Sequence, residues 1–136
     1  MGIIQFFNID KLRFEEKNAE FVNKIYAYKQ KYGEPHGYSF SIGFPAISIK
    51  KINPKIAKDI LKYFEEGVNS NPPHFHSVAS YGYLLYKSGQ KKKAYAHARR
   101  FVETTKKYSK GGKSAWAYNT MKSLEERKKP APFSSK

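Results

Sequence analysis

The stretch from Phe75 to Phe101 constrains the fold of this chain more than any other stretch. Small and apolar residues recur in it at intervals of three and four on both sides of Gly89, the spacing at which side chains share one face of a helix. Small side chains let two helix backbones approach closely, and a glycine can turn the chain without a clash of its β-carbon. The residues expected to form this contact and its turn are Ala79, Gly82, Leu85, Gly89, Ala94, Ala98 and Phe101. The stretch therefore predicts two antiparallel helices packed through small residues.

The remaining sequence predicts about three more helices and thus an all-α fold. Apolar residues recur at helical steps over 9–32, and Gly33 then supplies a C-terminal cap. Asn53 is a good N-cap and Pro54 suits the first turn of the next helix. We expect this helix and three further ones, over about 74–88, 90–108 and 115–128, to form a helical core over 53–128. The 136 residues suffice for one domain, 1–136.

Two segments are expected to be extended. Residues 34–52 contain several glycines and prolines, and Tyr38, Phe40, Ile42 and Phe44 alternate with small or polar residues, as in a half-buried strand. This insertion is either an extended arm or β-ribbon that needs a surface, or a loop packed on the protein's own helices. The tail, 129–136, is interrupted by prolines and has one apolar anchor, Phe133.

Aromatic residues are unusually frequent, at 16% of the chain, so besides filling the core some are expected at half-buried contact surfaces. The candidates are Tyr38, Phe40, Phe44, Trp116 and Phe133. Trp116 is expected to point away from the inner face of its helix. It then either anchors an interface or is covered by the tail folding back.

The charge is strongly positive, with 26 Lys and Arg against 11 Asp and Glu, a formal net charge of +15. Such an excess predicts a polyanionic neighbour, which is an acidic protein surface, an anionic membrane surface, RNA or DNA, unless the lysines are merely solvated. The charge concentrates after Lys87. The candidate binding face consists of Lys91, Lys92, Lys93, Arg99, Arg100, Lys106, Lys107, Lys110 and Lys113. A positive helix face binds phosphates without reading sequence, and Tyr95 and Tyr108 could stack on bases.

Nothing in the sequence indicates a reaction. The chain has no cysteine, which excludes disulfides and thiolate metal sites, and no common catalytic motif or paired catalytic carboxylates. His74 and His76 have the spacing of a metal-ligand pair but lack a third ligand nearby, so we expect capping or packing for them. No cofactor and no metal are expected. No apolar run approaches the ~20 residues that span a bilayer.

The central hairpin resembles the tetratricopeptide repeat, whose period is about 34 residues. With the repeat starting at Phe75, Tyr81 and Gly82 match its apolar–glycine pair, Gly89 falls at its turn and Ala94 and Ala98 take its small positions. Val78 departs from the large residue that the family prefers. Over about 53–128 the array also resembles the cytosolic domain of the mitochondrial fission protein family, although that family ends in a membrane anchor.

The resemblance implies a non-catalytic module that binds proteins. Together with the charge, it favours a structural subunit of a large assembly, for which we expect a mitochondrial respiratory-type complex, with the chain peripheral to the membrane. The alternatives are an RNA-binding component of a ribosome or other ribonucleoprotein, acting through 87–113, and a free adaptor. Outside mitochondria, the cytoplasm is the expected location.

Overall fold

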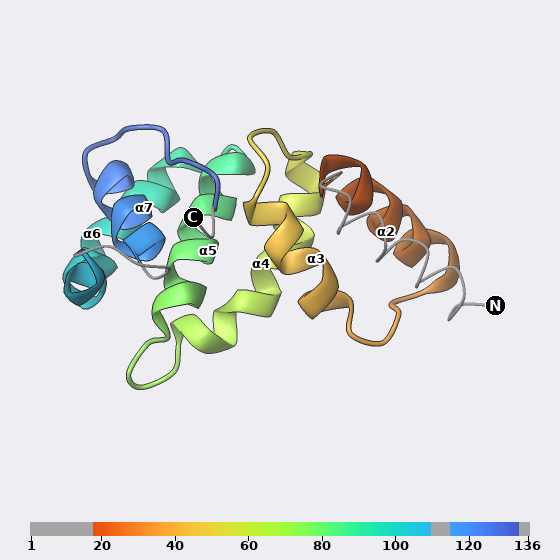
Figure 1. The fold of residues 1–136 in the computed structure, drawn as a ribbon, viewed down its shortest axis with the longest axis horizontal. Coiled ribbons are helices and arrows are strands. Elements are labelled where there is room, and N and C mark those ends of the chain that lie inside the picture. The colour runs from red at the N-terminus through yellow and green to blue at the C-terminus, as the bar shows by residue number, and fades with distance from the viewer. Residues whose placement is uncertain (1–17, 110–114, 134–136) are drawn as a thin grey trace.

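The structure, a computed structural model, describes residues 18–109 and 115–133. These residues form six α-helices and one short 3-10 turn, and no strand occurs among them. The elements are α2 (Asn18–Tyr32), α3 (Tyr38–Ile47), α4 (Pro54–Val68), α5 (Phe75–Lys87), α6 (Lys91–Thr105), η1 (Lys106–Tyr108) and α7 (Ala115–Glu125). The helices are arranged along the long axis of the molecule, with α2 near one end and α6 near the other (Figure 1). The predicted all-α fold is confirmed.

The helices begin and end where local chemistry favours it. The Asn53 side chain accepts the amide of Lys55 at 2.8 Å, and Pro54 opens α4. At the start of α5, Nδ1 of His74 accepts the amide of Ser77 at 3.4 Å. Gly89 adopts a left-handed conformation, with φ of +84°, between α5 and α6. These short connections make chain neighbours pack against each other.

Helix α5 lies at the centre of the stack. It packs against α4 on one side and against α6 and α7 on the other (Figure 1). Its residues from Val78 to Leu85 are buried, apart from the half-buried Tyr81. Helix α5 is thus buried on almost every side and forms the centre of the core. It belongs to the stretch 75–101, which most constrained the predicted fold.

The extended insertion predicted over 34–52 is wrong, because Tyr38–Ile47 form helix α3. Tyr38, Ile42 and Ala46, spaced by four, are all fully buried, as is Ile47. The helix packs against α2 and also contacts α4 and α5. A helix buried by several neighbours has little polar face, so its sequence lacks amphipathic contrast. Pro45 lies in the last turn of α3, where its carbonyl accepts the amide of Ser48.

After α7 the chain continues without helix and runs back toward α3. The amide of Phe133 donates to the carbonyl of Ile47 at 2.7 Å. The tail therefore ends, within the described residues, beside a helix far from it in sequence. None of the described helices is both long and apolar enough to span a membrane.

Candidate interaction surface

Helix α6 separates its small residues from its charges. Its inward side carries Ala94, Ala98, Phe101, Val102 and Thr105, all buried. The predicted cations on α6 and η1 are all exposed, and we call them the basic face: Lys91, Lys92, Lys93, Arg99, Arg100, Lys106 and Lys107. The structure thus brings seven of the nine predicted cations onto one helix and the turn that follows it. Lys110 and Lys113 lie outside the described residues.

The basic face is not neutralised by the described part of the chain. Ion pairs between described residues occur on α2, on α4 and around α7, through the cations of Lys24, Lys29, Lys122 and Lys128. No carboxylate in 18–109 or 115–133 pairs with a cation of the basic face, although Glu103 is exposed on the same helix. Charge that is not cancelled locally projects a positive potential into solvent.

A depression of about 340 Å³ adjoins the basic face between α4, α5 and α6. Val68, Leu85 and Phe101 supply apolar lining, while Lys93 and Arg100 belong to both the depression and the basic face. Glu65 contributes an opposing charge. The surface is therefore basic and has beside it a recess of mixed apolar and polar lining, and such a mixture suits contact with a protein better than contact with a bare phosphate backbone.

His97 borders this depression and is neutral at ordinary pH. Its Nε2 lies 2.8 Å from the carbonyl of Val78, to which it donates when that nitrogen carries the proton. Burial lowers the pKa of His97, and Arg100 lowers it further, although the bond to Val78 opposes them. His97 thus adds no charge to the surface and instead fixes α6 against α5.

The packing residues of the hairpin lie in its interior. Ala79, Ala94 and Ala98 have no exposed surface, and Leu85 and Phe101 are nearly as buried. A β-carbon at Gly82 would lie 2.7 Å from Cε of Met121 and 3.1 Å from Cδ2 of His97. The close approach at this glycine therefore involves α7 as well as α6.

The predicted interface aromatics divide into several environments. Tyr38 and Trp116 are buried in this structure. The indole of Trp116 donates to the carbonyl of Ala131 at 2.9 Å, and the tail covers it, the second of the two outcomes left open. Phe133 is partly buried, whereas Phe44 is 43% exposed. The side chain of Phe40 lies outside what the structure describes.

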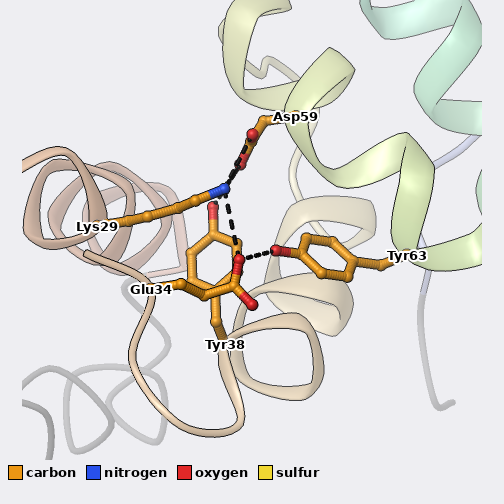
Figure 2. Close-up of polar contacts among 5 residues, drawn as sticks. All are labelled: Lys29, Glu34, Tyr38, Asp59 and Tyr63. Atoms are coloured by element: carbon orange, nitrogen blue, oxygen red, sulfur yellow. Dashed lines mark hydrogen bonds and ion pairs between the residues drawn. The ribbon is translucent and has the colours of Figure 1, made fainter.

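A polar cluster between α2, α3 and α4 was not predicted. The Lys29 amine donates to both oxygens of Asp59, at 3.0 and 2.8 Å, and the Tyr38 hydroxyl donates to the same carboxylate at 3.0 Å (Figure 2). The Lys29 amine also lies 3.7 Å from a carboxylate oxygen of Glu34, which accepts from the Tyr63 hydroxyl. We call these five residues the polar clamp. Its bonded members lie up to 30 positions apart, so no local spacing could reveal it.

The clamp links helices through partly buried, hydrogen-bonded groups. The Lys29 amine lies 4.7 Å from the ring centroid of Tyr38, a cation–π contact, and its side chain is only 15% exposed. Burial raises the pKa of Tyr38, and the Asp59 carboxylate beside it raises it further. Burial and Glu34 raise the pKa of Tyr63 in the same way. Both hydroxyls therefore remain protonated donors at neutral pH, and the cluster joins three helices.

The histidine pair on α5 has structural surroundings. His74 caps the helix, as described above, and the ring of His76 lies among Phe44, Trp116 and Phe133 at centroid distances of 5.0 to 5.9 Å. Within the described residues, no three His, Cys, Asp or Glu side chains are grouped so that they could hold a metal ion.

Comparisons of the chain with protein-family models, with curated proteins and with solved structures each found no match. The likeness to tetratricopeptide repeats and to the mitochondrial fission proteins therefore stays a prediction.

Proposed function

We propose that this chain is a non-catalytic structural subunit that docks on an acidic protein surface of a larger assembly through the basic face. The observation that carries the proposal is the row of exposed, unpaired cations on α6 and η1, beside a recess of mixed apolar and polar lining. The stacked helices support it, because modules of this type present rigid faces to partners. A mitochondrial respiratory-type complex remains the predicted setting, on the strength of the basic charge and size of the chain and of the resemblance.

An acidic protein fits this surface better than RNA does. Tyr108, a candidate for stacking on bases, already lies against Phe75, with ring centroids 4.2 Å apart. Tyr95 is partly buried, and the guanidinium of Arg127 lies 5.9 Å from its ring centroid. With both candidate rings already in contact with other side chains of this chain, the basic face offers RNA charge with less stacking.

The test reverses charge on the basic face and on a matched site. Lys92→Glu, Lys93→Glu and Arg99→Glu together change three exposed cations on α6, and Lys51→Glu, Lys55→Glu and Lys58→Glu change three exposed cations at the start of α4. We expect at least about tenfold less of the α6 variant than of the unmodified chain to co-migrate with high-mass material from the native source, because charge reversal across an interface adds repulsion. The α4 variant should co-migrate as the unmodified chain does.

Nuclease treatment separates the alternatives in the same experiment. Release of the unmodified chain by nuclease would assign the basic face to RNA, and migration of the unmodified chain as a lone monomer would contradict the subunit proposal. Equal behaviour of the two triple variants would contradict the role of α6.

A further inference from the structure

The tail is held to the helices mainly through its backbone. The carbonyl of Ala131 accepts the indole N–H of Trp116 at 2.9 Å, and the amide of Phe133 donates to the carbonyl of Ile47 at 2.7 Å. Neither bond involves a tail side chain. Main-chain bonding of this kind accepts any extended segment, and specificity then depends on the side chains between the bonds.

One side chain of the tail supplies that specificity. The ring of Phe133 lies edge-on to Trp116, with centroids 5.2 Å apart and an interplanar angle of 89°. It also lies 5.8 Å from the ring of Phe44 and 5.5 Å from that of His76. Three helices therefore each contribute one ring around a single aromatic anchor.

His76, whose ring lies against that of Phe133, keeps one hydrogen-bonding atom unused within the described part of the chain. Nδ1 of His76 lies 3.2 Å from the Ser80 hydroxyl, but Nε2 is buried and has no hydrogen-bond partner within 18–109 and 115–133. Buried polar atoms in native proteins are nearly always bonded, and an exception calls for an explanation. A segment bound in place of the tail could supply the acceptor or donor that the described tail does not.

We propose that the surface formed by Ile47 of α3, His76 of α5 and Trp116 of α7 is a binding site for an extended, proline-flanked aromatic segment of a partner protein. Residues 130–133 of this chain, Pro-Ala-Pro-Phe, occupy the site in the isolated protein, and the partner segment displaces them. Two proline rings pre-set the extended conformation and so lower the entropy lost on binding. The site lies apart from the basic face and does not depend on it.

Trp116 reports on occupancy, because it is the single tryptophan of the chain. The experiment uses the full chain, unmodified and with Phe133→Ala, and a synthetic peptide of residues 128–136, which has neither tryptophan nor tyrosine. We expect the peptide to shift Trp116 fluorescence in the Phe133→Ala chain with at least about tenfold higher affinity than in the unmodified chain. In the unmodified chain, the attached tail competes with the peptide at an effective concentration of about millimolar. The same peptide with Phe133→Ala should bind neither chain.

A measurement on the unmodified chain guards against misfolding of the variant. In amide hydrogen exchange, we expect the Phe133 amide to exchange at least about tenfold faster than the Leu85 amide of the central helix, because the tail opens while the helices stay folded. Equal protection of the two amides would overturn the proposal, as would a Phe133→Ala chain that ignores the peptide. A concentration-dependent dimer of the unmodified chain would assign the site to a second copy and would also overturn it.

Discussion

The two halves of the helix stack are held together by different means. Helices α2, α3 and α4 are joined through the polar clamp, in which the charged groups of Lys29 and Asp59 are largely withdrawn from water. Helices α5, α6 and α7 are joined through Ala79, Gly82, Ala94 and Ala98, which bring backbones close and bury apolar side chains between them. One half thus adds a few directional bonds to apolar packing that includes Val22, Ile25 and Ile42, while the other relies on close packing between small residues.

The difference shows what each kind of contact contributes. Close packing stabilises in proportion to the apolar surface removed from water. A partly buried ion pair gains less, because desolvation of both charges offsets most of their attraction. The clamp nevertheless holds α2 and α3 in one orientation on α4, since an amine bonded to two carboxylate oxygens tolerates little rotation. We call α5, α6 and α7 the packed half and α2, α3 and α4 the clamped half. We therefore expect substitutions in the packed half to lower the free energy of unfolding more than substitutions in the clamped half.

The largest effect is expected from adding volume at the crossing of α5 and α6. Ala98→Leu places three extra carbons where no surface is exposed, and we expect it to lower the free energy of unfolding by about 2 kcal/mol. The control is Ala96→Leu, two positions earlier on the exposed side of the same helix, which should change stability by less than about 0.5 kcal/mol. Urea denaturation measures both. Equal effects would show that α6 does not pack as described.

A smaller effect is expected from breaking the clamp. A double-mutant cycle with Lys29→Met and Asp59→Asn should give a coupling energy of about 1.5 kcal/mol, because the amine donates two charge-assisted bonds at a partly buried site. The matched pair is Lys24 and Glu20 on α2, 3.2 Å apart, with side chains 53% and 47% exposed. The cycle with Lys24→Met and Glu20→Gln should give only about 0.4 kcal/mol. A coupling energy between Lys29 and Asp59 no larger than this would mean that the clamp does not stabilise the fold.

The smallest expected effect is a decrease of the free energy of unfolding in mild acid, and it should arise from histidines of the packed half. Burial is the largest cause that lowers the pKa of both His76 and His97. Between the unfolded value of about 6.5 and the lower folded values, the unfolded chain binds more protons than the folded one. The free energy of unfolding should therefore fall as the pH drops from 7.5 to 5.5.

Two variants assign this acid dependence to the packed half. His76→Gln combined with His97→Gln should flatten it in urea denaturation, whereas Lys29→Met in the clamp should leave it unchanged. A slope that survives the double histidine substitution would place the titrating groups elsewhere.

The packed half could be predicted from the sequence, and so could α2 and α4, whereas α3 and the polar clamp could not, for a physical reason. Helices α5 and α6 were expected because small residues and Gly89 lie at intervals that a single helix turn defines, and α4 because Asn53 and Pro54 mark its start locally. Helix α3 was missed because it is apolar on nearly all sides and gives no periodic contrast. The clamp joins residues that only the folded chain brings together.

The candidate site, like the fold, could be predicted only in part. The cations at 91–93, 99–100 and 106–107 could be placed on one helix and the turn after it, because a helix fixes their relative directions. The aromatics could not, because exposure depends on what covers a ring. Trp116 was open to either outcome until the return of the tail was known.

That return has a consequence for cooperativity. Most contacts in the stack join neighbours along the chain, an arrangement that lets a helical array melt from one end. The hydrogen bond from Phe133 to Ile47 connects the last described residue to α3. It therefore couples the unfolding of the first helices to that of the last. A molecule tied in this way melts as one unit while the tail is seated. Once the tail is displaced, α2 and α3 are freer to open on their own.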